Sequence, residues 1–263
     1  MTEAIEFRNV SYAVAQGAVA QGAVAQGRLL LDGISLAVAE GTTTAILGRS
    51  GSGKTTLLRT VNRLILPTGG EVLVQGKNVA ALDLIELRRG MGYVIQETGL
   101  FPHFRVERNV GLVPEAEGVP QTERRRRSHE LLAAVGLDPG TFAHRYPHQL
   151  SGGQRQRVGL ARALAADPKI LLMDEPFGAL DPLTRAEMQD MLRGLLGSLG
   201  KTVLLVTHDL DEALYLADRI VLLGEGKLIA ELPPSEFMGS GQPEITAYIR
   251  AFHRGERSAA RQP

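Results

Sequence analysis

A run of consecutive residues early in the chain has the types and spacing of a loop that binds phosphate groups. It reads Gly48-Arg49-Ser50-Gly51-Ser52-Gly53-Lys54-Thr55. The run matches the pattern G-x-x-x-x-G-K-[ST] in full, in which glycines let the backbone wrap phosphate oxygens with its N–H groups pointing inward. Lys54 would place a cation on the β- and γ-phosphates, and the Thr55 hydroxyl suits Mg²⁺. Together with Thr56, these residues form the predicted nucleotide-binding set.

Two adjacent carboxylates form a second candidate group. The apolar run Ile170–Met173 predicts a buried strand, and Asp174 and Glu175 follow at its carboxyl end, where ligands bind in open α/β sheets. Asp174 would hold Mg²⁺ directly or through water. Glu175 is then placed to polarise an attacking water as a general base. By itself such a pair could simply end a strand, but beside a phosphate loop it predicts a nucleotide hydrolase.

The segment Leu150–Gln154 supplies a second place where an anion could bind. Its residues Ser151, Gly152, Gly153 and Gln154 precede a helix that we expect to begin near Gln156. A helix N-terminus carries partial positive charge and unpaired N–H groups, so it attracts phosphate. The chain has two such helix ends but one lysine-bearing loop. We therefore expect each site to be shared between two subunits of a dimer.

The elements that must position these residues follow an α/β order. Short strands are expected at 4–11 and 34–40, which form an N-terminal β region, and at 43–47, which leads into the phosphate loop. The helix after that loop should place Leu57, Leu58, Val61 and Leu64 on one face. Further strand material and a short helix are expected within 71–95.

The second half of the chain alternates strands with helices. Strands are expected at 170–173, 202–206 and 220–223, and helices after Asp181-Pro182 and at 210–217. The more polar residues 97–165 are predicted to form a helical subdomain. This alternation predicts an α/β fold with a parallel sheet, an N-terminal antiparallel β region and an inserted helical subdomain.

Three segments are interpreted without assigning them chemistry. Ala-Val-Ala-Gln-Gly occurs three times over 13–27, and its period of five fits neither a strand nor a helix, so we expect a surface loop. Arg124-Arg125-Arg126-Arg127 is expected on the solvated face of a helix, with Leu131, Leu132 and Val135 inward. The apolar-poor end from Arg254 is expected to be disordered.

The composition excludes several classes of function. The 263 residues contain 29 Lys and Arg and 29 Asp and Glu, so the basic excess of a typical nucleic-acid binder is missing. Cysteine is absent, which excludes disulfides and thiolate sites. No run approaches the roughly eighteen apolar residues of a spanning helix, and the acidic N-terminus does not resemble a signal peptide. We therefore expect a cytoplasmic protein that reaches membranes only through a partner.

Taken in order, these motifs resemble the ATP-binding-cassette family over essentially residues 4–240, and Leu150–Gln154 is similar to its signature. The resemblance implies a P-loop NTPase (RecA-like) core, with ATP and Mg²⁺ as ligands. Gln96 resembles the Q-loop glutamine, which contacts Mg²⁺ and water and reports to the membrane subunit. Asp181 resembles the D-loop aspartate, and His208 the switch histidine at the γ-phosphate. Glu175, His208 and Gln96 are thus the expected catalytic group, and Thr55, Gln96 and Asp174 the expected metal ligands.

One position departs from the family. Its members usually stack adenine on an aromatic side chain about four residues after the position of Val10, and Val14 stands there. Tyr12 lies two residues earlier, on the same side of an extended chain, and could replace that aromatic.

The branch of the family is suggested by two further segments. Glu175–Pro182 resembles importers, and Gly92–Gln96 followed by Gly99–His103 is similar to ATPases of importers for quaternary-amine osmoprotectants such as glycine betaine, choline or carnitine. This implies an ATP-hydrolysing subunit at the cytoplasmic face of the membrane. Its partners would be a transmembrane permease, a second ATPase subunit (a homodimer) and, indirectly, a solute-binding protein, without nucleic acid.

The resemblance leaves alternatives open. The chain could serve an importer of another small solute. A soluble non-transport ATPase would usually carry a second cassette or a long coiled-coil insert, and a catalytically dead regulator would lack Glu175 or His208. The expected organisation is a nucleotide-binding domain over 1–240, followed by a C-terminal helix and tail over 241–263. On this organisation, we expect the C-terminal regulatory domains that these relatives often carry to be absent.

Overall fold

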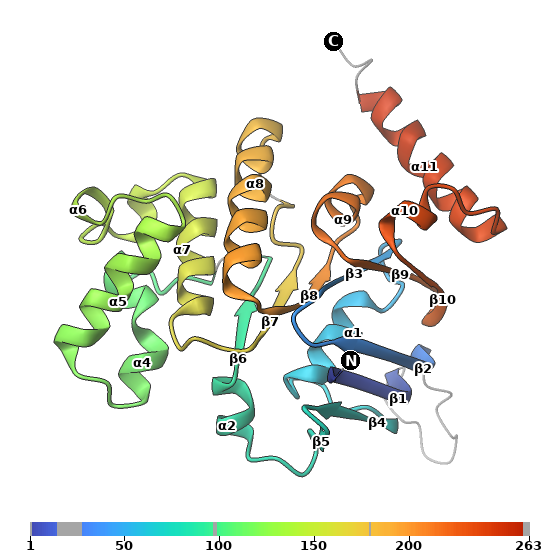
Figure 1. Ribbon diagram of the computed structural model, residues 1–263, viewed down its shortest axis with the longest axis horizontal. Helices are drawn as coiled ribbons and strands as arrows, with labels where there is room; N and C mark the ends of the chain where they lie inside the picture. The colour runs from blue at the N-terminus through green and yellow to red at the C-terminus, as the bar shows by residue number, and fades with distance from the viewer. Residues whose placement is uncertain (1, 15–27, 97–98, 179, 260–263) are drawn as a thin grey trace, which may run out of the picture. The chain divides into compact units, whose positions relative to one another are not determined.

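The computed structural model describes residues 2–14, 28–96, 99–178 and 180–259, with side chains up to His253. The chain falls into two units (Figure 1). The first combines Met1–Asp83 with Val206–Pro263, and the second is Leu84–Leu205. Within the described residues, no helix is long and apolar enough to cross a membrane.

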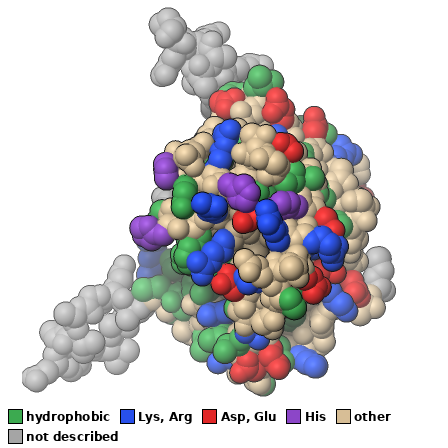
Figure 2. Space-filling view, turned by 90° about the vertical axis from the view of Figure 1, so that its left-hand side faces the viewer, with side chains coloured by type: hydrophobic (Ala, Val, Ile, Leu, Met, Phe, Trp, Pro, Cys, Tyr) green, Lys and Arg blue, Asp and Glu red, His purple; other side chains and the backbone are tan. Residues whose placement is uncertain are grey.

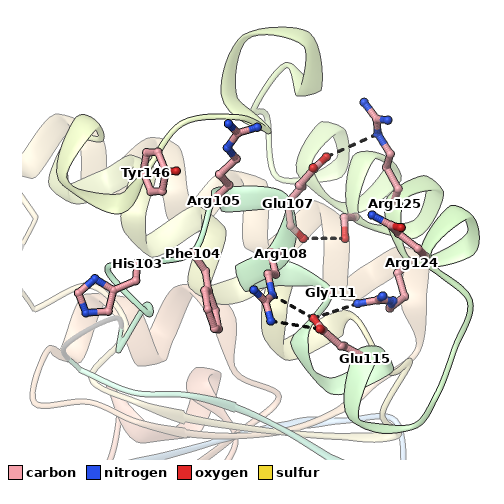
Figure 3. A pocket seen from close by; sticks show the side chains of 12 residues that line it. His103, Phe104, Arg105, Glu107, Arg108, Gly111, Glu115, Arg124, Arg125 and Tyr146 are labelled. Atoms are coloured by element: carbon pink, nitrogen blue, oxygen red, sulfur yellow. Dashed lines mark hydrogen bonds and ion pairs between the residues drawn. The ribbon is translucent and has the colours of Figure 1, made fainter.

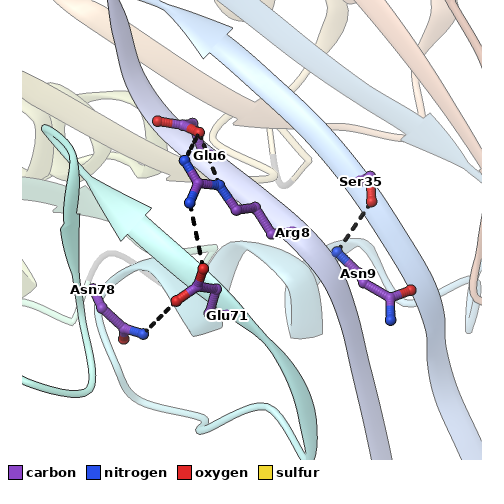
Figure 4. A network of polar contacts seen from close by, with 6 residues as sticks. All are labelled: Glu6, Arg8, Asn9, Ser35, Glu71 and Asn78. Atoms are coloured by element: carbon purple, nitrogen blue, oxygen red, sulfur yellow. Dashed lines mark hydrogen bonds and ion pairs between the residues drawn. The ribbon is translucent and has the colours of Figure 1, made fainter.

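An antiparallel sheet in the first unit has the order β2-β1-β4-β5. Its strands are β1 (Glu3–Val14), β2 (Arg28–Ala39), β4 (Gly69–Val74) and β5 (Lys77–Asn78). Ile5 and Phe7 alternate with outward residues and are buried. On the outer face, Arg8 pairs with Glu6 at 2.7 Å and with Glu71 at 3.4 Å, and Asn78 donates to Glu71 (Figure 4). The predicted antiparallel β region is thus present.

The first two strands are longer than we predicted. β1 extends to Val14, and Val14 pairs with Arg28 at the start of β2. Ala13 and Val14, which we assigned to the repeat-containing loop, therefore belong to a strand. They do so because they continue the pairing of β1 with β2. The remainder of that loop, residues 15–27, lies outside the described residues.

The strand before the phosphate loop is β3 (Thr43–Gly48), and all six of its residues are buried. It runs parallel to β9 (Arg219–Gly224), which pairs with the antiparallel β10 (Lys227–Leu232). Burial on both faces explains why β3 is apolar throughout its second half instead of alternating. The sequence therefore correctly predicted a strand leading into the loop.

The helices of the first unit are α1 (Lys54–Val61), α9 (Leu210–Leu216), α10 (Pro234–Phe237) and α11 (Pro243–Ala259). In α1, Leu57, Leu58 and Val61 are buried as predicted. Leu64 was wrongly placed on the same face: the helix ends at Val61, and Leu64 is 50% exposed. The chain end was also wrongly assigned, since α11 continues from Arg254 to Ala259. Residues 260–263 lie outside the described residues.

The second unit contains strands in the order β8-β7-β6. They are β6 (Met91–Val94), β7 (Ile170–Asp174) and β8 (Thr202–Val206), and β6 runs parallel to β7. Two further helices of this unit are α2 (Leu84–Arg89) and α8 (Pro182–Leu199). The five residues of β7 are all buried, which agrees with the predicted core strand.

The remaining helices of the second unit are drawn together in green and yellow in Figure 1. They are α3 (Val106–Val110), α4 (Leu112–Ala116), α5 (Gln121–Ala134), α6 (Pro139–Phe142) and α7 (Gly152–Leu164), with a 3₁₀ turn at Pro147–Gln149. Val106, Val110, Leu132 and Leu164 are almost completely buried and form their core. These helices lie within the predicted 97–165, although the boundaries of a separate subdomain stay a prediction.

The four consecutive arginines lie on α5 as predicted, with Leu131, Leu132 and Val135 buried. Each arginine pairs with a carboxylate. Arg124 meets Glu115 at 2.9 Å and Arg125 meets Glu107 at 3.6 Å, while Arg126 and Arg127 contact Glu130. Basic and acidic side chains are interspersed over the face in Figure 2. The run is therefore neutralised locally, which disfavours its use as a polyanion site.

Candidate nucleotide-binding and hydrolysis site

The phosphate loop joins β3 to α1 in the first unit, and its glycines are required by close packing. A Cβ on Gly48 would lie 2.4 Å from the carbonyl oxygen of Leu223, and one on Gly53 would lie 2.6 Å from that of Leu30. Gly53 also has φ of 99°, a left-handed conformation that favours glycine, immediately before α1. These glycines therefore allow the loop to lie against β2 and β9.

Lys54 and Ser52 fill the inside of this loop. The Lys54 ammonium donates to the carbonyls of Gly48 at 2.8 Å and Arg49 at 3.1 Å, and Lys54 is only 5% exposed. The hydroxyl of Ser52 is buried and has no hydrogen-bond partner. Buried polar atoms are nearly always paired in native proteins. An oxygen-bearing ligand in the loop would supply the missing partner, so the loop fits a bound phosphate.

The loop that carries His208 also belongs to the first unit, where it is tied to the strand of the phosphate loop. The Thr207 N–H donates to the Ile46 carbonyl at 3.2 Å, and the Thr207 hydroxyl donates to buried Glu212 at 2.6 Å. Asp209 caps α9 by accepting from the N–H groups of Asp211 and Glu212. His208 itself is exposed, so its imidazole is accessible to a ligand.

Tyr12 is connected to the phosphate loop through its neighbouring strand. It pairs with Leu31, whose side chain lies 2.8 Å from the position of a Cβ on Gly53. The strand register shifts between Tyr12 and Ala13, so the simple alternation that put Tyr12 and Val14 on one side does not hold. Tyr12 is half-buried and Val14 is 41% exposed. That Tyr12 stacks on adenine stays a prediction.

The two carboxylates follow β7 in the second unit. Asp174 is 3% exposed, and the Tyr93 hydroxyl on β6 lies 3.5 Å from its carboxylate. Glu175 adopts φ of 48°, which non-glycine residues rarely do outside functional or strained sites. The Gln96 side-chain amide donates to the Glu175 carboxylate at 3.4 Å. The second unit therefore brings together three of the predicted residues, Gln96, Asp174 and Glu175.

The predicted anion-binding segment Ser151–Gln154 also lies in the second unit. α7 begins at Gly152, not near Gln156 as we predicted. Ser151 and Gln154 each cap the other: the Gln154 N–H donates to the Ser151 hydroxyl at 3.3 Å, and the Ser151 N–H to the Gln154 side chain at 3.0 Å. This capping box extends the helix by a turn, because it satisfies N–H groups that would otherwise end it.

This segment packs against the start of α8. A Cβ on Gly153 would come within 2.5 Å of the Thr184 methyl group. Asp181 caps α8 by accepting from the Thr184 N–H at 3.1 Å, and hydrogen bonding by Thr184 lowers the pKa of the Asp181 carboxyl. Hence Ser151–Gln154 and Asp181, predicted as separate motifs, are neighbours through Thr184.

Three residues at the site were missed by sequence reasoning. Tyr93 lies beside Asp174, and the Gln156 amide donates to the carbonyl of Pro176, directly after Glu175. Tyr248 on α11 donates to the backbone of His208. The β6–β7 pairing could have suggested Tyr93, whereas nothing in the sequence near Tyr248 pointed to the site.

A separate pocket of about 500 Å³ lies among α3, α4 and α5 (Figure 3). Arg108 covers the Phe104 ring at 3.9 Å and, with Arg124, pairs with Glu115. None of the predicted site residues lines it. Arg125 pairs with Glu107, and Arg105 lies 6.0 Å over the Tyr146 ring. Three of the four arginines that line the pocket are therefore engaged by carboxylates, so it differs from a phosphate cradle.

Two features of the chain define the class of P-loop nucleotide-binding proteins. One is the glycine-rich loop between a buried parallel strand and a helix, and the other is the Asp-Glu pair after a second buried strand. Residues 31–178 match the family model described as "ABC transporter". The chain belongs to this ATP-binding-cassette transporter family.

Among curated proteins, the chain is 45% identical over 233 residues to the glycine betaine/carnitine/choline transport ATP-binding protein OpuCA of Bacillus subtilis, covering 89% of this chain and 60% of the relative. It is 44% identical over 231 residues to the osmoprotectant import ATP-binding protein OsmV of Salmonella typhimurium, covering 88% of this chain and 60% of the relative. The chain thus spans about three fifths of the length of these relatives.

Solved structures give the same fold. The dimeric, post-hydrolysis structure of the ATP-binding cassette MJ0796 bound to ADP and Pi has a TM-score of 0.76 at 35% identity, covering 88% of this chain and 98% of that one. CbiO1 from Clostridium perfringens, part of the transporter complex cbiONQ, has a TM-score of 0.79 at 27% identity, covering 97% of this chain and all of that one. The predicted α/β P-loop fold is therefore confirmed.

Proposed function

We propose that the chain is the ATP-hydrolysing subunit of an importer and drives solute uptake through a separate transmembrane permease. The observation that carries the proposal is the phosphate loop, in which buried Lys54 meets two loop carbonyls and the buried Ser52 hydroxyl has no partner. A bound triphosphate would offer hydrogen-bond acceptors to both side chains. The Lys54 ammonium could then donate to anionic phosphate oxygens instead of neutral carbonyls, and the Ser52 hydroxyl would gain an acceptor.

The remaining roles follow from the residue types. Thr55, Asp174 and Gln96 offer the hard oxygen ligands that Mg²⁺ prefers, alongside phosphate oxygens and water. When bound, the ion would neutralise charge on the phosphates. Glu175 would accept the proton of the attacking water, and Gln96 holds that carboxylate through its amide nitrogen. His208 would contact the γ-phosphate.

The shared-site arrangement requires a second subunit. Ser151–Gln154 at the N-terminus of α7 would bind the γ-phosphate held by the loop of the partner, with Asp181 crossing between subunits. We propose a homodimer at the cytoplasmic face of the membrane beneath the permease, with a solute-binding protein delivering the solute from outside. The names of OpuCA and OsmV support a quaternary-amine osmoprotectant as that solute.

The first test is ATP hydrolysis by the purified chain and its Lys54→Ala variant. Loss of the buried cation should lower turnover by about 10²–10³-fold, the usual effect of removing an electrostatic contact to the reacting group. Lys77→Ala, which removes an exposed lysine of the same unit, is the matched control and should retain turnover. Turnover of the Lys54→Ala variant at the wild-type level would refute the phosphate-loop assignment.

The transport function is tested separately. Cells that lack the gene and its transport partners should lose uptake of radiolabelled glycine betaine, choline or carnitine, most clearly in hyperosmotic medium. Normal uptake of all three would refute the osmoprotectant assignment while leaving ATP hydrolysis in place.

A further inference from the structure

Helix α11 contacts the His208 loop of the first unit through Tyr248. Ile245, Tyr248, Ile249 and Phe252 recur at the spacing of one helical face. Ile245 is completely buried, so this face packs against the unit. The Tyr248 hydroxyl donates to the carbonyl oxygen of His208 at 3.1 Å.

The same hydroxyl is also influenced by the backbone of Gly48, the first residue of the phosphate loop. Burial raises the pKa of Tyr248 to about 12, and hydrogen bonding by the Gly48 backbone acts in the opposite direction. The phenol therefore stays protonated through the physiological range and can donate to His208. Tyr248 thus lies between the two loops that would hold the γ-phosphate.

The contact lies at the centre of the switch loop, between two residues that are held from other directions. Thr207 is fixed by Ile46 and Glu212, and Asp209 by the first turn of α9. Between them, the His208 carbonyl is held by Tyr248, which lies forty residues further along the chain. By holding the His208 carbonyl, the hydroxyl restrains the backbone from which the imidazole projects.

We propose that Tyr248 is a positioning residue for ATP hydrolysis: it ties α11 to the His208 loop and the phosphate loop, so that the seating of α11 sets the orientation of His208. The inference rests on the proposed function of this site. It makes α11 a control point, because any event that lifts Tyr248 from His208 would slow hydrolysis without blocking nucleotide binding.

The test compares ATP hydrolysis by Tyr248→Phe with that of the wild type. Removing one neutral hydrogen bond is worth about a two- to tenfold effect. We expect kcat to fall by that factor, equally at pH 6 and pH 9, with KM for ATP unchanged within about twofold. Amide exchange at residues 208–210 should become faster. Ile249→Val, which trims the same helix face without touching the hydroxyl, should match the wild type in kcat and exchange.

The outcomes separate the inference from the proposed function. If the wild type hydrolyses ATP and Tyr248→Phe has the same kcat, the positioning role is refuted and the ATPase assignment stands. An equal loss of kcat in Ile249→Val would also refute it, since packing of α11 would then matter and not the hydroxyl. Absence of hydrolysis by the wild type, or wild-type turnover in His208→Ala, would instead refute the role of the site.

Discussion

The side-chain amide of Gln96 donates to the carboxylate of Glu175 across 3.4 Å, which joins the ends of the parallel strands β6 and β7. The bond is long, so it orients the carboxylate without engaging it fully. Glu175 is also held by a left-handed backbone with φ of 48°. The candidate base is therefore positioned from two directions, by its own backbone and by Gln96.

Replacing Glu175 with Gln should separate ATP binding from hydrolysis. The side chain keeps its shape but cannot accept a proton, so turnover should fall by about 10²–10⁴-fold. ATP should still bind through the phosphate loop and bridge to Ser151–Gln154 of the second subunit. Because ligand that binds only the dimer drives dimerisation, the variant should be monomeric without nucleotide and dimeric with Mg·ATP in light scattering.

Ser151→Arg added to Glu175→Gln is the control for the shared site. The arginine side chain would block the N-terminus of α7, so the double variant should remain monomeric with ATP. A Glu175→Gln chain that stays monomeric at saturating ATP, both alone and with its permease, would contradict the shared site.

Gly153→Ala should strain the contact between α7 and α8. A Cβ would lie 2.5 Å from the Thr184 methyl, and overpacking of this kind costs about 1–3 kcal/mol. Adding Thr184→Ser removes that methyl and should restore the thermal unfolding midpoint. If Gly153 also approaches a phosphate of the other subunit, ATPase activity should not return with stability. Full recovery of both the unfolding midpoint and the ATPase activity in the double variant would mean that Gly153 has only a packing role.

Tyr12→Ala should weaken ATP binding by about 1–3 kcal/mol if the ring stacks on adenine. Tyr12→Phe keeps the ring and should bind normally, which makes it the matched control. Val14→Tyr should not tighten binding, since the register shift after Tyr12 breaks the alternation between the two positions. Titration with a fluorescent nucleotide measures all three, and tighter binding by Val14→Tyr would place the base against residue 14.

The pair Asp167–Lys201 predicts a pH-dependent loss of stability in the second unit. A 2.7 Å bond from Lys201 lowers the pKa of the Asp167 carboxyl below its usual value. A carboxyl whose folded pKa is depressed stabilises the fold above its unfolded pKa of about 3.9, and this contribution is lost as pH falls through the folded pKa.

Asp167→Asn should therefore lower the free energy of unfolding at pH 7 by at most about 1 kcal/mol, because Asp167 is exposed. Asn suits the left-handed backbone of this position, where φ is 50°, so the variant isolates the charge. The difference from the wild type should shrink in urea titrations as the pH falls below about 3.9. A difference that does not change with pH would mean that the charge is not its source.

Local patterns with a strict geometric meaning were predictable from the sequence. The phosphate loop, the strand before it and Asp174-Glu175 after β7 each lie where their residue types require. Leu64 was misplaced because periodicity does not reveal where a helix ends. The start of α7 was misplaced because the capping box of Ser151 and Gln154 brings two glycines into the first turn of the helix. Tyr248 depends on a tertiary contact from a distant helix, which no local pattern encodes.

The pairing of Val14 with Arg28 gives the tandem repeat an evolutionary consequence. Each copy begins with Ala-Val, so loss or gain of a whole copy still leaves Ala-Val after Tyr12 and preserves the end of β1. Joining two fixed strand ends through five more residues costs only about 0.3 kcal/mol of closure entropy. Slippage of the encoding DNA could therefore change the copy number between strains at almost no cost to the fold, which makes this hairpin a natural place for length polymorphism.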